Sequence, residues 1–199
     1  MLHSAENFDA LYAADEDPWH LQSRWYEARK RALTLACLPA ARYPRAYEPG
    51  CANAELSVAL AARCDHLLVS DGSARAVQLA RRRTQALPQV EVLQAWLPAQ
   101  WPGRTFDLIV ISELGYYLRP ADLDQLAHRL LGSMQPGATV LACHWRQPIE
   151  GCLLSGDAVH QRLAQRLALP HLAGYVDDDL RLDVWSHDAR SAAQREGFR

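Results

Sequence analysis

Short apolar runs alternate with amphipathic segments along most of this chain. The clearest run, 106–111, is almost wholly apolar, which is typical of a buried middle strand in a parallel sheet. The other β-like runs lie at 46–47, 66–70, 90–93, 139–143, 172–176 and 180–185. The amphipathic segments predict helices over 26–38, 54–63, 73–84, 122–134 and 155–169. This alternation predicts an α/β fold with a doubly wound, mostly parallel sheet.

The two ends of the chain differ from its middle. Residues 1–44 are polar and aromatic, and we expect them to form a helical lid or cap region. The acidic loop 177–179 joins the last two strands, so one C-terminal strand should run antiparallel to the others. The chain has no internal repeat or domain boundary. We expect a single domain over 1–199, either alone or within a longer polypeptide in which a partner domain supplies substrate or specificity.

Composition narrows the class of protein without identifying it. The chain has 199 residues, 49% of them hydrophobic, which is enough for one well-buried domain. Its net charge is −2, and the one basic run, 81–83, fits a solvated helix face better than a nucleic-acid surface. No apolar run is long enough to span a bilayer. The five cysteines include no C-x-x-C pair, which disfavours disulfides and zinc and favours the cytoplasm.

A tight turn between the first two strands carries the clearest chemical signal. Glu48 ends the first strand, Gly50 lies in the turn, and Asp71 ends the second strand, 23 positions after Glu48 (71 − 48). That spacing fits a mononucleotide-binding βαβ unit, in which the turn approaches the ligand and the acid holds a ribose. Acids at both places suit adenosylmethionine, with its sulfonium, ammonium and ribose diol. Each residue also has a purely structural interpretation. Glu48 could cap backbone N–H groups, Gly50 could be an ordinary turn glycine, and Asp71 could be a helix N-cap.

Blocks along almost the whole chain resemble one enzyme class. They lie at 8–12 and 17–19, 48–55, 106–113 and 116–118, 144–145, 156–160 and 181–185. These residues are similar to class I adenosylmethionine-dependent methyltransferases, and more narrowly to the nodulation protein S family, whose named member N-methylates the terminal amino sugar of a chitooligosaccharide. The resemblance implies a Rossmann-like sheet of seven strands, S-adenosylmethionine as cofactor and a small-molecule acceptor, such as a carbohydrate amine. Neither nucleic acid nor membrane is expected as a partner.

Two departures from the family pattern affect the expected cofactor site. Ala52 and Ala54 stand where such enzymes usually carry the second and third glycines of the turn. A left-handed backbone costs a non-glycine residue about 1–2 kcal/mol, so strain at both alanines would weaken cofactor binding. Alanine is the mildest replacement, and a turn without positive φ would carry no strain. Trp96 aligns with an aspartate that commonly accepts a hydrogen bond from the adenine amino group in such enzymes. The Trp96 indole cannot accept that hydrogen bond, so it either stacks on the adenine or packs elsewhere.

The strand ends and the resemblance together define the candidate site. The predicted cofactor-binding residues are Glu48, Gly50, Cys51, Asp71, Gly72, Trp96 and Ser112. The predicted catalytic residues are Glu113 and His144, at the ends of the fourth and fifth strands. The predicted substrate-binding residues are Tyr116, Tyr117, Trp145, Asp157 and His160. Trp19, Trp25 and Tyr26 form either a lid over the cofactor or, as we favour, a hydrophobic seam. No metal site is expected.

An amine acceptor requires little catalytic machinery. Methyl transfer from a sulfonium is an in-line displacement, helped mainly by placing the nucleophile about 3–3.5 Å from the methyl carbon. At pH 7, deprotonating an amine that titrates near 7.7–8.0 costs about 1–1.4 kcal/mol, against about 4.6 kcal/mol for a lysine-like amine. An amino sugar therefore fits a site without a strong base. We hypothesise that Glu113 or His144 accepts a hydrogen bond or proton from this amine.

Two other functions remain open on the sequence. A nicotinamide-dependent oxidoreductase shares the βαβ start, but the turn lacks G-x-G-x-x-G. A degenerate methyltransferase fold could instead serve as a non-catalytic binding or partner module, as the two alanines and Trp96 suggest.

Overall fold

One mixed sheet forms the centre of the molecule. The computed structural model describes residues 5–199 of the chain. The strands are β1 (Tyr43–Pro49), β2 (Cys64–Asp71), β3 (Val90–Gln94), β4 (Phe106–Ser112), β5 (Met134–Trp145), β6 (His171–Val176) and β7 (Leu180–Ser186). Their order is β3-β2-β1-β4-β5-β7-β6. β1 to β5 pair in parallel, while β7 pairs antiparallel with both β5 and β6. The predicted sheet, with one antiparallel C-terminal strand, is confirmed.

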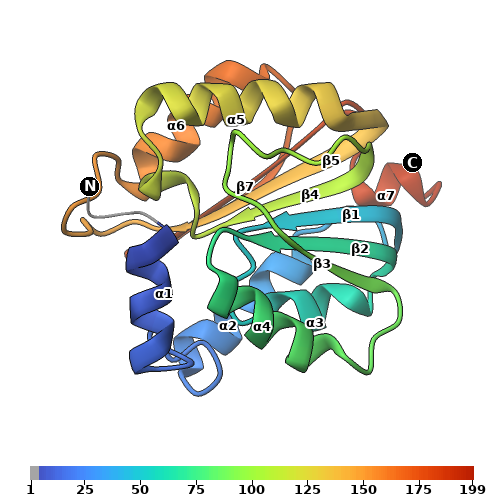
Figure 1. Cartoon of the computed structure of the whole chain (residues 1–199). Coiled ribbons are helices and arrows are strands. Elements are labelled where there is room, and N and C mark those ends of the chain that lie inside the picture. Colours follow the sequence, from blue (N-terminus) through green and yellow to red (C-terminus); the bar gives the residue numbers. More distant parts are fainter. Residues whose placement is uncertain (1–4) are drawn as a thin grey trace.

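Helices cover both faces of this sheet (Figure 1). On one face lie α2 (Trp25–Ala36), α3 (Glu55–Ala61) and α4 (Ala74–Thr84). On the other lie α5 (Pro120–Ser133) and α6 (Gly156–Leu167). The helices α1 (Ala5–Ala14) and α7 (Ala192–Arg195) and the 3-10 turn η1 (Gly115–Tyr117) complete the elements. None of the described helices is long and apolar enough to cross a membrane.

Strand β4 shows why a near-continuous apolar run is needed in the middle of the sheet. Its Leu108 and Val110 belong to the core beneath α2, α3 and α4, whereas Ile109 and Ile111 belong to the core beneath α5 and α6. All four side chains are fully buried. Because successive residues of a strand point to opposite faces, a strand covered on both sides has no polar face. The sheet therefore divides the protein into two apolar cores.

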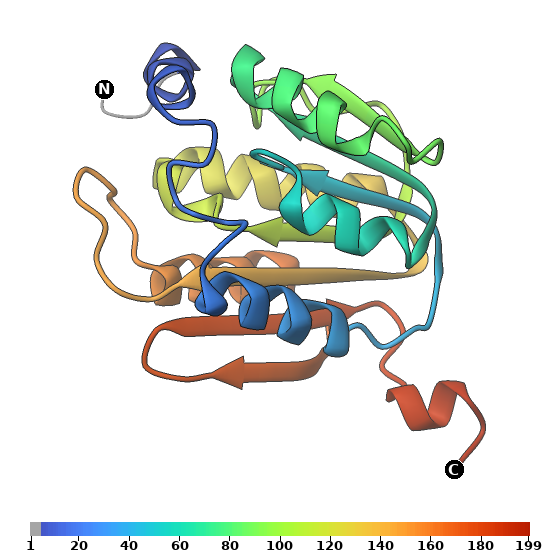
Figure 2. The same ribbon diagram turned by 90° about the horizontal axis from the view of Figure 1, so that it is seen from below.

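The N-terminal region differs from a plain helical cap. α1 packs beside α4 rather than on the sheet, and the loop from 15 to 24 returns to α2 across the carboxyl ends of the strands (Figure 2). Asp9 of α1 accepts a hydrogen bond from the Arg75 backbone N–H at 3.2 Å, at the start of α4. Asn53 Nδ2 donates to Asp17 Oδ1 at 2.9 Å, which ties the loop to the turn after β1. This segment therefore closes one side of the sheet edge where ligands bind in doubly wound folds.

The turn between β1 and α3 carries backbone strain. Gly50, Ala52 and Ala54 all have positive φ, at 73°, 52° and 65°. The two alanines thus occupy left-handed positions that favour glycine. The backbone N–H groups of Gly50 and Cys51 donate to the Ser70 carbonyl at 2.7 and 2.9 Å, so β2 holds the turn in place. Neighbouring contacts therefore maintain a conformation that the sequence alone disfavours.

This strain predicts a stabilising substitution. Ala52→Gly removes about 1–2 kcal/mol of left-handed strain and adds about 0.4–1 kcal/mol of unfolded-state entropy, so the free energy of unfolding should rise by about 0.5–1 kcal/mol. Ala54 is fully buried, and losing its methyl costs roughly a further 0.8 kcal/mol, so Ala54→Gly should be close to neutral. Urea denaturation of the two variants measures both effects. A loss of stability in Ala52→Gly would contradict the assignment of strain.

Candidate active site

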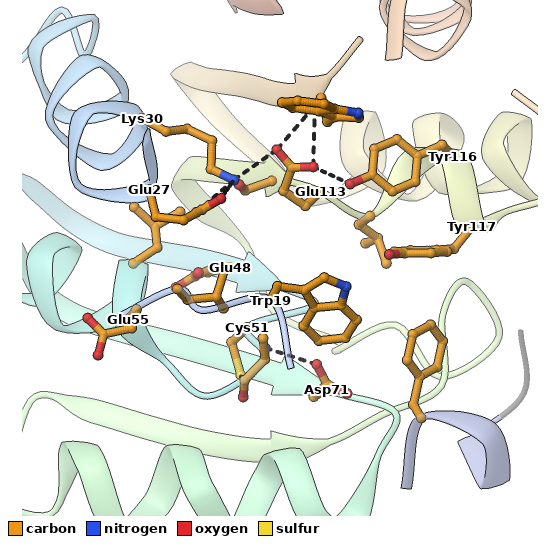
Figure 3. A pocket seen from close by; sticks show the side chains of 18 of the residues that line it. Trp19, Glu27, Lys30, Glu48, Cys51, Glu55, Asp71, Glu113, Tyr116 and Tyr117 are labelled. Carbon is orange, nitrogen blue, oxygen red and sulfur yellow. Dashed lines mark hydrogen bonds and ion pairs between the residues drawn. The ribbon is translucent and has the colours of Figure 1, made fainter. Parts of the chain in front are cut away.

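A pocket of about 430 Å³ lies at the carboxyl ends of the parallel strands (Figure 3). β1 leads into α3 on one face of the sheet and β4 leads into α5 on the other, so a crevice opens between these neighbouring strands. The pocket receives side chains from the ends of β1, β2 and β4, from α2, and from the N-terminal loop. The topology alone therefore brings residues from distant parts of the chain together.

The pocket includes most residues that the sequence predicted for it. All of the predicted cofactor-binding residues line it: Glu48, Gly50, Cys51, Asp71, Gly72, Trp96 and Ser112. Of the predicted catalytic and substrate-binding residues, it includes Glu113, Tyr116, Tyr117 and Trp145. It does not include His144, Asp157 or His160.

Glu48 presents a buried carboxylate to the pocket. Its side chain is 2% exposed, and Oε2 accepts no hydrogen bond from any described residue. Burial raises the pKa of Glu48 to about 8; the Ser57 hydroxyl opposes this shift and the nearby Asp71 carboxylate adds to it. An unpaired carboxylate in such a place is costly unless a ligand supplies a positive charge or a donor. Glu48 is therefore suited to bind a cationic group.

Asp71 is fixed by backbone groups of the turn. Its Oδ2 accepts from the Ala52 N–H at 3.0 Å and its Oδ1 from the Ser73 N–H at 2.9 Å. Burial raises the pKa of Asp71, although these N–H groups oppose the shift. The N-cap of α4 is Ser73, whose hydroxyl accepts from the Ala76 N–H at 3.1 Å. Asp71 therefore does not serve as the helix cap, and it lines the pocket.

Trp96 lies on the backbone of Gly72. A Cβ atom at Gly72 would come within 2.2 Å of the indole Cε3, so only glycine allows this contact. The indole is 40% exposed and lines the pocket. The exposed part of the indole can therefore stack on a planar ligand group, although the indole cannot accept a hydrogen bond from it.

The sequence did not predict a buried ion-pair cluster on the opposite wall. Lys30 Nζ lies 3.1 and 2.9 Å from the two carboxylate oxygens of Glu27 and 3.0 Å from Glu113 Oε1 (Figure 3). Glu27 and Lys30 are buried and lie three positions apart on α2. Burial alone would lower the pKa of Lys30, but the carboxylates of Glu113 and Glu27 raise it above its usual value. This lysine therefore remains an ammonium.

Glu113 makes several further hydrogen bonds. Its Oε2 accepts from the Tyr116 hydroxyl, and the Trp145 N–H lies 3.1 and 3.3 Å from its two oxygens. Glu113 also has a positive φ of 55°, which turns the chain from β4 into η1. Its position in the pocket agrees with the prediction. Its carboxylate is nevertheless held by partners on three different elements, so it is a structural centre of the site as well.

The predictions for His144 and His160 need correction. The Gly115 N–H donates to His144 Nε2 at 3.0 Å, so the proton of this imidazole is on Nδ1, which faces His160 Nε2 at 3.1 Å. His160 Nδ1 in turn donates to Asp183 at 2.7 Å. Burial lowers the pKa of His144 well below its usual value. Neighbouring residues of a strand point to opposite faces of the sheet. Trp145 therefore lines the pocket, whereas His144 points toward α6 and accepts the hydrogen bond from Gly115.

Asp157 also lies outside the pocket. Asp157 lies in the first turn of α6 and pairs with Arg146 at 2.9 Å. The hydrogen bond from Arg146 is the main cause of the lowered pKa of Asp157. Its three-residue spacing from His160 does place both residues on one helix, but His160 turns inward and Asp157 outward.

The N-terminal aromatic residues divide between two environments. Trp19 and Tyr26 line the pocket, and the Trp19 ring lies 5.6 Å from that of Tyr12 and 6.5 Å from that of Phe8. Trp25, in contrast, is 77% exposed and lies outside both cores. Trp19 therefore combines both predicted roles, lining the pocket and packing in an aromatic cluster. Within residues 5–199, no group of His, Cys, Asp and Glu side chains is arranged to hold a metal ion.

Comparisons with known proteins agree with this architecture. The chain is 52% identical to a Pseudomonas syringae protein described as a candidate methyltransferase, with a TM-score of 0.74 over 82% of this chain and 99% of that one. It shares its fold with the N-methyltransferase NodS from Bradyrhizobium japonicum, crystallised with S-adenosyl-L-homocysteine, at a TM-score of 0.81 and 21% identity over 92% of this chain and 98% of that one. The fold is that of the Rossmann-like methyltransferases.

The model of the family "Nodulation protein S (NodS)" matches residues 5–147. The chain is 32% identical over 141 residues to nodulation protein S of Rhizobium tropici and 30% identical over 139 residues to that of Sinorhizobium fredii, matches that each cover 68% of this chain. It spans 59% and 64% of the lengths of these two relatives. The chain belongs to the nodulation protein S family.

The burial of Glu48 predicts a pH-dependent stability. Its native pKa of about 8 lies above its usual value of 4.5, so the native state holds a proton that the unfolded state has lost. Relative to Glu48→Gln, the wild type should therefore lose about 1.4 kcal/mol of unfolding free energy per pH unit between those values. Denaturant titrations at pH 5, 7 and 9 measure this difference. The control variant Glu91→Gln, at an exposed site, should not show this pH-dependent difference from the wild type. A difference between Glu48→Gln and the wild type that stays constant with pH would contradict the raised pKa of Glu48.

Proposed function

We propose that this protein transfers a methyl group from S-adenosylmethionine to the amine nitrogen of a small molecule, such as an amino sugar. The observation that carries the proposal is the buried Glu48, which lines a pocket at the switch point of a methyltransferase fold and whose Oε2 has no hydrogen-bond partner among the described residues. A ligand cation beside Glu48 would favour its ionised form, and adenosylmethionine brings both an ammonium and a sulfonium.

The residues present fit the parts of that cofactor. Glu48 would bind the ammonium, and Asp71, already oriented by two backbone N–H groups, would accept from the ribose hydroxyls. Gly50 has a left-handed φ that opens the turn toward the ligand, and the face of Trp96 would stack on the adenine. Of the two strained alanines, Ala52 lines the pocket, to which it adds a single methyl group, and Ala54 is not among the lining residues.

Bound adenosylmethionine would supply the electrophilic methyl carbon. The task of the protein is then to position the acceptor nitrogen in line with that carbon and to exclude water. The aromatic walls made by Tyr26, Tyr117 and Trp145 suit both tasks. Glu113 and its hydrogen-bonded Tyr116 lie at the same end of the pocket and would orient the acceptor.

An amine acceptor is favoured over a hydroxyl. The described part of the pocket contains no free imidazole to deprotonate an alcohol, since His144 is buried elsewhere in a histidine pair. An amine of low basicity needs only a modest free energy to lose its proton near neutral pH. The N-methyltransferase named among the structural relatives supports the same choice by analogy.

A non-catalytic partner module is the second candidate function. The two strained alanines and Trp96 motivated it. The open pocket, the intact carboxylates Glu48 and Asp71 and the family membership all count against it. A nicotinamide enzyme is disfavoured for the same reasons.

Two ligands separate the predicted roles of Glu48 and Asp71. S-adenosylhomocysteine has the amino-acid group, whereas 5′-methylthioadenosine lacks it and keeps the ribose and adenine. Glu48→Gln should weaken S-adenosylhomocysteine binding about tenfold or more and leave methylthioadenosine binding within about twofold, since a charge-assisted hydrogen bond is worth about 1.5–3 kcal/mol. Asp71→Asn should weaken both. Calorimetric titration measures these constants, and equal losses for both ligands in Glu48→Gln would contradict the proposed orientation.

A further inference from the structure

The charges on the acceptor side of the pocket do not balance. Glu27 and Glu113 each carry a negative charge and Lys30 a positive one, so this group of three, in which Glu113 is only partly buried, has a net charge of −1. Both Glu27 and Lys30 are more than nine-tenths buried. Water stabilises a net charge there poorly, so one more cation would complete the cluster.

The two carboxylates differ in their free capacity. The four hydrogen-bond contacts of Glu113, from Lys30, Tyr116 and the Trp145 N–H to both oxygens, use most of its lone pairs. Among residues 5–199, the hydrogen-bond and ion-pair contacts of Glu27 are with Lys30, one of each kind. Lone pairs therefore remain on Glu27, at a wall of the pocket.

Two other groups indicate that a polar ligand binds in this pocket. The Tyr26 hydroxyl is buried and has no hydrogen-bond partner among the described residues, and the Tyr26 ring lies 5.5 Å from Lys30 Nζ. The buried Oε2 of Glu48 is also unpartnered and lines the same pocket. Among the described residues, the Tyr26 hydroxyl, next to Glu27 in the chain, and Oε2 of Glu48, before the turn, thus lack hydrogen-bond partners.

We propose that Glu27 binds the acceptor as an ammonium and then takes one of its protons, so that Glu27 is the proton acceptor of the reaction. This inference rests on the proposed methyl transfer to an amine and names the residue that frees the nucleophile. An N–H bond of the ammonium breaks, its electron pair stays on nitrogen as the nucleophilic lone pair, and the proton forms an O–H bond on Glu27. The group of three changes from −1 to neutral.

The surroundings of Glu27 favour this transfer. Burial raises its pKa, an effect that Lys30 and Arg31 on the same helix oppose and Glu113 after β4 supports. Lys30 does not compete as a nucleophile, because its two carboxylate partners hold it protonated. Cys143 of β5 also faces Lys30, and burial raises its thiol pKa to about 12, so it stays neutral at physiological pH. Glu27 is therefore the group whose charge changes.

A binding measurement tests the ammonium site without any turnover. D-glucosamine and D-glucose share a ring and differ in an ammonium at one position, so their dissociation constants from the protein saturated with S-adenosylhomocysteine can be compared at pH 6.5. The wild type should prefer glucosamine by at least tenfold. Glu27→Gln keeps an oxygen for Lys30 but makes the group of three neutral, and it should reduce that preference to less than threefold. Glu91→Gln, exposed on β3, should keep it.

The pH profile then tests the proton transfer. Methylation by Glu27→Gln should be tens- to hundreds-fold slower at pH 6.5 and should rise about tenfold per pH unit up to the acceptor's own pKa, because only free amine can react. The wild-type rate should be nearly flat over the same range. A residue that only supports the fold would change thermal stability without changing this slope. Glu27→Asp, which retains a carboxylate, should restore the wild-type profile with a lower kcat and replaces the Gln variant if that variant does not fold.

The outcomes separate the inference from the proposed function. The role of Glu27 would be overturned if Glu27→Gln kept both the preference for glucosamine and the wild-type pH profile. It would also be overturned if the wild type did not prefer glucosamine to glucose. If the wild type binds S-adenosylhomocysteine but methylates no amine, the proposed function is overturned, and the binding comparison alone still decides whether Glu27 forms an ammonium site.

Discussion

The ammonium of Lys30 is the contact on which the acceptor side of the pocket depends. It joins α2 to the end of β4 by bridging Glu27 and Glu113, and Glu113 in turn holds Tyr116 and the backbone of Trp145. Without this cation, the buried Glu27 carboxylate would lie unpaired beside the partly buried Glu113 carboxylate, and breaking a buried ion pair typically costs about 3–5 kcal/mol. One lysine therefore fixes a helix from the N-terminal region against the sheet edge and keeps the left-handed turn at Glu113 in place.

The other half of the pocket depends on sheet topology rather than on a cation. The order of the strands brings the ends of β1 and β2 side by side, so Glu48 and Asp71 lie in one turn region although a helix separates them in sequence. Asp71 has backbone donors and Glu48 has an oxygen without a partner among the described residues. The pocket thus has a prearranged acceptor for a neutral diol and an incomplete site for a positive charge, which match the ribose and the ammonium of adenosylmethionine.

Much of this arrangement could be predicted from the sequence, and the failures have physical causes. Apolar runs such as 106–111 identified buried strands, and the Glu48 and Asp71 spacing identified the turn, because both signals are local. Glu27 and Lys30 were missed because charged residues on a helix are normally solvated, and only tertiary packing against Glu113 shows that these are buried. His144 was misplaced because alternation along β5 gives the pocket to Trp145 and turns the imidazole toward His160, which no local pattern indicates.

Glu48 is expected to bind the ammonium of an adenosyl ligand in this pocket. Calorimetry of S-adenosylhomocysteine binding at pH 7, in two buffers with different ionisation enthalpies, counts the protons exchanged on binding. Because the free protein has a Glu48 pKa of about 8, the carboxyl is mostly protonated at pH 7 and must ionise to pair with the ligand ammonium. Binding should release roughly one proton in the wild type, and Glu48→Gln should abolish this release. Binding without proton release, or no binding at millimolar ligand, would contradict this role of Glu48.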